Sequence, residues 1–199
     1  MNEFIQMIKN RRSNYTLSNE KVVPLKEIEQ IIKDSVKYVP TAFNIQSSKV
    51  VVLFDEQHEK LWDIVKNTLQ KRISPEAFLK TEQKINNSFR SGYGTILYFD
   101  DTNLTSELQT KFPSYKDNFP IWAEQANGML QFAIWTALSN QGLGVSLQHY
   151  NPLIDDEVKK TWQIPASYKL IAQMPFGKQV SAPASKTFEP VETRIKIYK

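Results

Sequence analysis

One apolar segment, Trp122 to Gln141, limits the possible folds more than any other stretch of the chain. Small and large apolar side chains are interleaved along it: the small ones are Ala123, Ala126, Gly128, Ala133 and Ala137, and the large ones include Met129, Leu130, Ile134 and Leu138. A helix that is apolar on nearly every side is a buried helix. Small residues allow a second backbone to approach closely, so we expect this helix at the centre of the fold or of a dimer. Gly142 and Gly144 follow it and are expected to end it.

Shorter patterns predict further helices. They are expected at Glu3 to Asn10, from Pro24 onward with Leu25, Ile28 and Ile32 on one face, around Leu61, Trp62, Val65 and Leu69, and from Ser74-Pro75-Glu76 through Phe78, Ile85 and Phe89. Helical spacing of apolar residues supports each of them. Ser74 followed by Pro75 is a typical helix start, because Ser caps the first turn and Pro fits its first position.

Runs of β-branched and other apolar residues predict buried strands. The expected strands are Lys49 to Phe54, Thr95 to Phe99, Val145 to Leu147 and Lys169 to Met174, and Gly92-Tyr93-Gly94 is interpreted as a turn. Helices and strands do not alternate strictly, so the expected fold class is α+β. Residues Arg194 to Tyr198 alternate between polar and apolar, which predicts a terminal strand paired in its own sheet or in a partner's.

The overall composition narrows the class of protein. The chain has 199 residues, with no repeat and no Gly- or Ser-rich linker, so we expect residues 1–199 to form a single domain. It contains no Cys, which excludes disulfides, thiolate metal sites and a Cys nucleophile. No signal peptide and no apolar run of about 18 residues are recognised, so a cytoplasmic protein without a membrane partner is expected.

The net charge of +4 has more than one interpretation. The lysines are scattered along the chain, as on an ordinary solvated surface, whereas a nucleic-acid footprint would cluster them. No nucleic-acid partner is therefore expected. A weaker functional interpretation is attraction of anionic small molecules, such as a flavin phosphate or a nicotinamide dinucleotide.

Several catalytic patterns are absent from the sequence. There are two His, His58 and His149, and neither belongs to a pattern of metal ligands. The Gly-x-Ser-x-Gly turn of hydrolases, the Gly-x-Gly-x-x-Gly fingerprint and the phosphate-loop pattern do not occur. If the chain is an enzyme, a bound cofactor is expected to perform the chemistry.

Arg11-Arg12-Ser13 follows the first predicted helix. Two guanidiniums and a hydroxyl can bind a phosphate through charge-assisted hydrogen bonds, and they can place positive charge near a flavin pyrimidine ring. For this triplet taken alone, a basic helix C-terminus favoured by the helix dipole is the better explanation. Lys186, in a Pro-rich stretch from Ser181 to Pro190, would on its own be a solvated lysine.

Two loops could face a flat ligand. Residues Pro40 to Ser48 combine a rigid start, small side chains and the amides of Asn44 and Gln46, although an ordinary polar connector would look similar. Residues Gly142 to Tyr150 form a Gly-rich turn that can bring backbone N–H groups close to a ligand. Taken alone, His149 in this turn is more often structural than catalytic.

Together, these motifs resemble those of the nitroreductase family of flavin reductases. Arg11-Arg12-Ser13 is similar to the family's opening Arg-Arg/His-Ser, and Pro40 through Gln46 is similar to its Pro-Ser-x-x-Asn-x-Gln segment. The Ala-rich helix before Gly142 resembles the central dimer helix, and Lys186, four residues before Pro190, resembles the C-terminal phosphate-binding Lys or Arg. Thr41-Ala42-Phe43-Asn44 with Ser47-Ser48 is most similar to a short, fatty-acid-repression-type subgroup.

The resemblance implies a homodimer with a central, mostly antiparallel sheet flanked by helices, FMN at the subunit interface and the C-terminal strand exchanged between subunits. It implies that FMN takes a hydride from NAD(P)H and passes two electrons to a nitroaromatic, quinone or similar small-molecule acceptor, without a catalytic side chain or a metal. The cofactor-binding residues it implies are Arg11, Arg12, Ser13 and Lys186 on the phosphate and pyrimidine side, Tyr15 near the flavin carbonyl, Pro40, Thr41, Ala42 and Asn44 from the partner, Leu147, Gln148 and His149 near the ring, and also Gln46.

Two departures from the family pattern concern the ring. Tyr15 stands where many relatives carry Lys or Arg near the flavin carbonyl, so the flavin potential is in question. Ser47-Ser48 replaces the usual Pro-Trp after Gln46, so ring packing and acceptor choice are in question. A flavin-binding regulator or store with little turnover is an alternative function, and a basic nucleic-acid-binding module is a weaker one that rests on charge alone.

Overall fold

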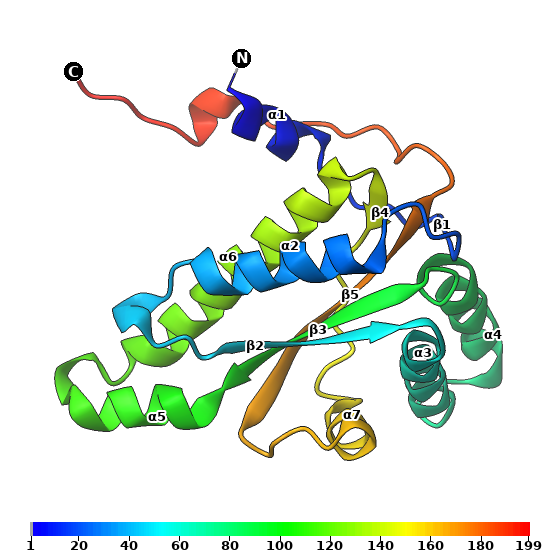
Figure 1. Ribbon diagram of the computed structural model, residues 1–199, viewed down its shortest axis with the longest axis horizontal. Coiled ribbons are helices and arrows are strands. Elements are labelled where there is room, and N and C mark those ends of the chain that lie inside the picture. The colour runs from blue at the N-terminus through cyan, green and yellow to red at the C-terminus, as the bar shows by residue number, and fades with distance from the viewer. Residues whose placement is uncertain (1) are drawn as a thin grey trace.

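The computed structural model describes residues 2–199 (Figure 1). The helices are α1 (Glu3–Asn10), α2 (Leu25–Tyr38), α3 (Asp55–Gln70), α4 (Pro75–Lys84), α5 (Thr102–Lys111), α6 (Asn118–Asn140) and α7 (Asp155–Trp162). The strands are β1 (Leu17–Ser18), β2 (Ser48–Phe54), β3 (Gly94–Asp101), β4 (Leu143–Val145) and β5 (Tyr168–Gln179). Helices and strands are mixed along the chain, and the α+β class expected from the sequence is confirmed.

The strands form one antiparallel sheet in the order β1-β5-β3-β2, with β4 also paired to β5. The two central strands, β3 and β5, are long, and β3 is buried along almost its whole length. Strand β2 pairs only with β3 and therefore forms one edge of the sheet. An edge strand presents unpaired backbone groups that can accept a further strand.

Helices cover both faces of the sheet, because successive strand residues point to opposite faces. Ile96 and Tyr98 of β3 join a core with α2 and α6, whereas Leu97 and Phe99 join a second core with α3 and α7. Figure 1 shows α2 and α6 on one side of the sheet and α3, α4 and α7 on the other. The continuous apolar run that predicted β3 is thus explained by burial on both faces.

Helix α6 is the longest helix of the structure, with 23 residues. Its inner face, which includes Leu130, Ile134 and Leu138, packs against α2 and the sheet. The expectation of a helix buried on every side is wrong for the single chain, because Ile121, Met129 and Phe132 are 53%, 45% and 38% exposed. The single chain supplies neighbours for only one face of α6, so the other face lies open.

Several element boundaries differ from those expected. Helix α6 begins at Asn118, one turn before Trp122, and Gly142 follows its end in a left-handed conformation with φ of 82°. Strand β4 spans Leu143–Val145, two residues earlier than expected. The helix capped by Ser74 continues into a π-helical turn, Ile85–Phe89. Ile85 and Phe89, both predicted on the apolar face of this helix, lie in the core.

The strand expected at residues 194–198 is not formed in the single chain. After the short turn Val191–Thr193 the backbone has no regular structure, and every side chain there is exposed. The tail runs past α1 and away from the sheet (Figure 1). Pairing with the chain's own sheet is therefore wrong, which leaves pairing with a partner as the remaining interpretation of the alternation.

Candidate functional site

A basic cleft lies where the two ends of the chain meet. It has a volume of about 450 Å³. Its walls are residues 11–16, between α1 and β1, and residues 181–186, beyond β5. Arg11, Arg12, Ser13, Tyr15 and Lys186, predicted from separate parts of the sequence, all line this one cleft. The structure therefore brings together five of the residues that sequence reasoning singled out.

Hydrogen bonds hold the two walls of the basic cleft side by side. The buried side chain of Asn14 donates to the Ser181 carbonyl at 2.8 Å, and its backbone N–H donates to the Val145 carbonyl at 2.9 Å. The Arg12 guanidinium donates to the Ala184 carbonyl. Asn14 thus ties β4, the N-terminal segment and the C-terminal segment together, a role that nothing in the sequence pattern signalled.

The charge of the basic cleft is unbalanced. Arg11, Arg12 and Lys186 contribute three cations, and the residues that line the cleft include no carboxylate. Burial, together with the neighbouring charge of Arg12, lowers the pKa of Arg11 from its usual value. A phosphate in the cleft would relieve this repulsion and would accept charge-assisted hydrogen bonds from the guanidiniums and the Ser13 hydroxyl. The donor set therefore fits a phosphate group.

A second cavity continues from the basic cleft onto α6, because Arg11 and Ser13 line both. This second cavity, of about 340 Å³, is completed by residues of α6 and of the segment after β4: Gly128, Gln131, Phe132, Trp135 and Leu147. The Arg11 guanidinium lies over the Trp135 ring at 4.5 Å from its centre. The spacing 128, 132 and 135 follows one helical face and could have been recognised in the sequence.

The segment after β4 is fixed by the buried side chain of Gln173 on β5. Gln148 exchanges two backbone hydrogen bonds with Gln173, at 2.7 and 2.9 Å, and the Gln173 Oε1 accepts from the Tyr150 N–H at 2.7 Å. This arrangement points Leu147 toward Arg11 and Ser13. His149, between the two anchored residues, is exposed. Leu147 thus joins the predicted site, whereas Gln148 and His149 lie beside it.

The predicted loop from Pro40 to Gln46 is a tight, strained turn. Phe43, Asn44 and Gln46 have positive φ angles of 53°, 52° and 55°, which are uncommon for residues other than Gly. The Thr41 Oγ1 accepts a hydrogen bond from the Gln46 N–H at 3.1 Å and closes the turn. The loop is therefore well defined in shape, in contrast to an ordinary polar connector.

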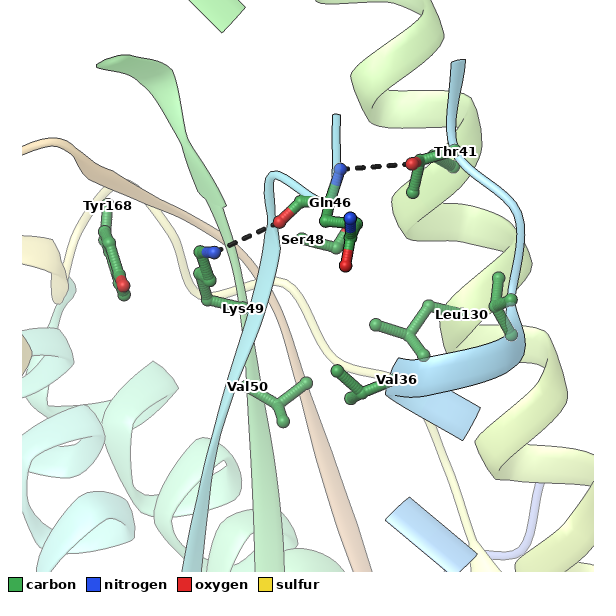
Figure 2. A pocket seen from close by; sticks show the side chains of 10 residues that line it. Val36, Thr41, Gln46, Ser48, Lys49, Val50, Leu130 and Tyr168 are labelled. Atoms are coloured by element: carbon green, nitrogen blue, oxygen red, sulfur yellow. Dashed lines mark hydrogen bonds between the residues drawn. The ribbon is translucent and has the colours of Figure 1, made fainter. Parts of the chain in front are cut away.

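The loop contributes to a cavity of about 360 Å³ between α2 and the edge strand β2 (Figure 2). Thr41, Gln46 and Lys49 form its polar side, and the Lys49 ammonium donates to the Gln46 carbonyl at 3.1 Å. Apolar side chains form its floor: Val36, Val39, Val50, Ala126 and Leu130. Figure 2 shows Val36, Val50 and Leu130 turned toward one another below Thr41 and Gln46.

The loop and the basic cleft do not meet within one chain. The Phe43 ring packs on Phe119 and Trp122 near the start of α6, whereas Arg11 packs on Trp135 near its end. The 13 residues from Trp122 to Trp135 correspond to about 20 Å along a helix. Pro40, Thr41, Ala42, Asn44 and Gln46 therefore lie apart from Arg11 and Lys186, and Figure 1 shows the two groups beside opposite ends of α6.

Nowhere in residues 2–199 do three or more acidic or His side chains gather as metal ligands. In the same part of the chain, no helix is both long and apolar enough to cross a lipid bilayer. The buried His58 is bound to Thr95 and to the Arg90 carbonyl in the core between α3 and β3.

Comparison with known proteins gives a consistent assignment. The model of the nitroreductase family matches residues 8–178. The nitroreductase FRM2 of Saccharomyces cerevisiae is 30% identical over 187 residues, which are 93% of this chain and 92% of FRM2. Nitroreductase CinD from Lactococcus lactis, solved with chloramphenicol, is 38% identical, with a TM-score of 0.90 over 99% of this chain and 100% of CinD.

A more distant neighbour has the same fold. A nitroreductase with bound FMN from Desulfitobacterium hafniense is 17% identical, with a TM-score of 0.74 over the full length of both chains. The similarity to FRM2 agrees with the fatty-acid-repression-type subgroup expected from the motifs. The family model, which spans most of the chain, and the two closer relatives lead to the same conclusion: this chain belongs to the nitroreductase family.

Proposed function

We propose that the protein is an FMN-dependent oxidoreductase that uses NAD(P)H to reduce nitroaromatic, quinone or similar small-molecule acceptors. The observation that carries the proposal is the convergence of three cations and the Ser13 hydroxyl on one cleft without a carboxylate. Such a cleft fits the phosphate of FMN, and it opens into a flatter cavity walled by Phe132, Trp135 and Leu147. Family membership supports the same cofactor.

The predicted site residues take the following roles in this proposal. Arg11, Arg12, Ser13 and Lys186 hold the phosphate and place positive charge on the pyrimidine side, where Tyr15 also lies. Leu147, Gln148 and His149 lie near the ring. Bound FMN supplies the redox chemistry, since it accepts a hydride from NAD(P)H and passes two electrons to an acceptor. The chain's own residues bind and orient the cofactor, exclude water and stabilise negative charge on the reduced ring.

We propose that two chains complete the site. Gly128 lies at the centre of the exposed face of α6, and a Cβ added there would meet nothing within 4 Å in the same chain. Gly in the middle of a helix costs about 0.5–1 kcal/mol relative to Ala, so an outside neighbour is the better explanation for it. A two-fold axis near Gly128 would place the loop of one chain beside the basic cleft of its partner. Pro40, Thr41, Ala42, Asn44 and Gln46 would then contribute to the partner's cofactor site.

The same dimer gives the C-terminal tail a place to bind. Strand β2 is an edge strand, and residues 194–198 carry alternating apolar side chains with no partner strand in their own chain. Adding the tail of one subunit to β2 of the other would satisfy both elements and bury the exposed side chains of Ile195 and Ile197. The exchanged strand expected from the family resemblance is therefore retained as part of the proposal.

The acceptor class rests on chemistry and on a relative. CinD has been solved with chloramphenicol, with nicotinic acid and with 4-nitrophenol, three molecules that each contain an aromatic ring. We expect this protein to accept flat aromatic oxidants as well. A cytoplasmic location, a single domain and the absence of nucleic-acid and membrane partners remain predictions from the sequence.

The deciding experiment is a visible spectrum of the purified protein, followed by anaerobic titration with NADH and NADPH. A yellow protein whose flavin is bleached by either nucleotide, and recoloured by an acceptor, would support the proposal. A colourless protein that does not bind added FMN would contradict it. A flavin that binds but is not bleached would favour the alternative, a flavin-binding regulator or store, for which the uncharged Tyr15 beside the cleft is the specific observation.

A further inference from the structure

A small polar cavity, of about 180 Å³, lies where β3, α5, α6 and β5 meet. It shares no residue with the basic cleft or with the second cavity. Among its lining residues, Lys169 of β5 is the one cation. Six of the others carry a side-chain oxygen: Asp100 of β3, Thr102, Thr105, Ser106 and Gln109 of α5, and Glu124 of α6.

The side chain of Asp100 is buried in the wall of this polar cavity, with one of its two oxygens unpaired. Asp100 is 6% exposed, and its Oδ2 accepts a hydrogen bond from the Thr105 hydroxyl at 3.2 Å. Within residues 2–199, no donor lies within hydrogen-bond distance of the Asp100 Oδ1. A buried carboxylate oxygen without a partner is costly, and a bound ion or water is its usual explanation.

The nearby ammonium of Lys169 does not satisfy Asp100. The two residues are cross-strand partners on β5 and β3, but the Lys169 Nζ lies 2.9 Å from the Glu124 Oε1. The Lys169 and Glu124 side chains are 56% and 60% exposed, so their ion pair faces solvent. Because Glu124 balances Lys169, the charge of Asp100 has no counter-charge among the lining residues.

The size of the polar cavity and its oxygen atoms favour Mg²⁺. A water molecule occupies about 30 Å³ in the liquid, so the cavity has room for an ion with several of its waters. Mg²⁺ keeps such waters and binds proteins through one or two carboxylates, whereas Ca²⁺ takes about six to eight oxygens. Rotation of the Asp100 carboxyl group about its soft torsion exchanges the two oxygens and turns Oδ1 to the cavity.

We propose that the polar cavity is a Mg²⁺ site in which Asp100 binds the hydrated ion. The Ser106 hydroxyl and the Gln109 amide oxygen accept hydrogen bonds from its waters; the Gln109 amide nitrogen is already held, because it donates to the Lys116 carbonyl at 2.9 Å. The ion stabilises the junction of β3, α5 and α6 and takes no part in the proposed redox chemistry. Ser48, at the end of the loop that begins at Pro40, is the cross-strand partner of Asp100, so the site also supports the base of this loop.

Paramagnetic Mn²⁺, a substitute for Mg²⁺, can locate the ion. The protein, labelled with ¹³C at the isoleucine δ1 methyl groups, is titrated with MnCl₂ at constant ionic strength, with and without added FMN. The signal of Ile171, which lines the polar cavity, should broaden first in both cases, and excess MgCl₂ should restore it. Ile85, in the core on the opposite face of the sheet, is the internal control. An Ile171 signal that broadens no earlier than that of Ile85 would overturn the proposal.

Variants at Asp100 separate a built site from ions that bind loosely to the surface. Asp100→Asn keeps the shape of the side chain and removes its charge, so it should weaken Mn²⁺ binding at least tenfold, measured from the EPR signal of free Mn²⁺. Asp156→Asn, at an exposed residue of α7, is the matched control and should bind as the wild type does. Equal affinities in all three proteins would contradict the proposal.

Stability gives a second measurement. Because Mg²⁺ would bind the folded chain, MgCl₂ should raise the urea midpoint of the wild type and of Asp156→Asn relative to NaCl at equal ionic strength. Asp100→Asn should lose this increase. Ser106→Leu fills the polar cavity from an exposed position of α5, so it provides the same comparison if Asp100→Asn does not fold. A Mg²⁺-induced increase that persists in the variants would contradict the proposal.

Lys169→Met distinguishes a bound metal ion from an internal counter-ion. If Mg²⁺ is the ligand, removing the neighbouring ammonium abolishes a repulsion and frees Glu124, so the variant should bind Mn²⁺ more tightly than the wild type. If Lys169 itself turns to Asp100, the wild type will bind no Mn²⁺ at the polar cavity, and binding will first appear in the variant. That second result would overturn the proposal.

Discussion

The guanidinium of Arg11 lies 4.5 Å from the centre of the Trp135 ring, so the basic cleft and the central helix α6 are in direct contact. This contact orients one of the three cleft cations and removes part of it from water. Burial lowers the pKa of Arg11, and the nearby charge of Arg12 adds to the effect. Two repelling cations held in place without an acidic neighbour in the cleft are prepared to bind an anion.

The first prediction concerns the phosphate. Replacing both Arg11 and Lys186 with Ala should weaken FMN binding by about 1.5–3 kcal/mol or more, the scale of hydrogen bonds to charged groups. Fluorescence titration of the apoprotein with FMN measures the change. The double variant Lys26→Ala with Lys80→Ala lowers the net charge equally at exposed sites outside the cleft, and it should bind FMN normally. Unchanged affinity in the cleft variant would mean that the phosphate binds elsewhere.

The second prediction concerns the flavin potential. Tyr15 lines the basic cleft and is 48% exposed, so a longer cationic side chain at this position can reach the cleft, although the edge-to-face contact with Phe89 is lost. Tyr15→Lys should raise the midpoint potential, because a fixed positive charge stabilises the anionic reduced ring. An added stabilisation of about 1.4 kcal/mol corresponds to about 30 mV for a two-electron couple. Redox titration against indicator dyes measures the midpoint potential. The uncharged control Tyr15→Phe should have a potential close to that of the wild-type protein. A potential that falls or stays the same in Tyr15→Lys would contradict the assignment.

The third prediction concerns assembly. Gly128→Trp should prevent dimer formation, since the indole would fill the space into which a second α6 is proposed to pack. Gly128→Ala should keep the dimer if the helices leave room for one methyl group, and it should stabilise the helix by about 0.5–1 kcal/mol. Light scattering after size-exclusion chromatography gives the mass of each variant. A fully dimeric Gly128→Trp protein would show that the subunits meet elsewhere.

The fourth prediction concerns stability and pH. His58 is fully buried: its Nδ1 lies 2.7 Å from the Thr95 Oγ1, and its Nε2 lies 3.3 Å from the Arg90 carbonyl. The Arg90 carbonyl can only accept, so the neutral imidazole carries its proton on Nε2 and its Nδ1 accepts from the Thr95 hydroxyl, whose oxygen also accepts from the Trp62 indole N–H. Burial lowers the pKa of His58 from 6.5 to about 4. The unfolded chain therefore binds a proton between these values and the folded chain does not.

The contribution of His58 to the free energy of unfolding should accordingly be fully present above pH 6.5. It should be lost as the pH is lowered toward about 4. The contribution of this one group is about 3 kcal/mol at most, at 1.36 kcal/mol for each pKa unit. Urea unfolding at a series of pH values measures the slope. His58→Gln should flatten it, whatever its own stability, whereas His149→Gln, at an exposed position, should not. Equal slopes for all three proteins would show that His58 has the same pKa in the folded and unfolded chains, against this prediction.

Much of the fold could be predicted because the pattern of apolar side chains along the sequence indicates which residues are buried. The apolar run Thr95 to Phe99 gave β3, and Ser74 with Pro75 gave the start of α4. Helix α7 was not predicted, although its first turn carries Asp155, Asp156 and Glu157, a charge pattern that favours a helix N-terminus. Helix α5 was not predicted either. It has one buried residue, so its sequence shows no clear helical spacing of apolar side chains.

The residues at the two ends of the chain that form the basic cleft could be predicted from the sequence, but their arrangement in space could not. Arg11 and Lys186 could be selected by charge and resemblance, but their approach depends on hydrogen bonds from Asn14 and Arg12 to the C-terminal segment, which no local pattern encodes. The alternation at residues 194–198 predicted a strand, yet a strand needs a partner that a single chain does not provide. The shape of the loop at Phe43 depends on a left-handed backbone that propensities do not predict for a bulky residue.

The backbone of Phe43 also limits which side chains the loop can carry at this position. A φ of 53° is tolerated by Gly, Asn and Asp far better than by β-branched residues. A saturation library at this position should therefore yield folded proteins with small or polar replacements, whereas Val, Ile and Thr should be depleted whatever ligand is offered. Shortening the side chain is therefore a small step for such a library, whereas introducing branched aliphatic groups would first require a different loop.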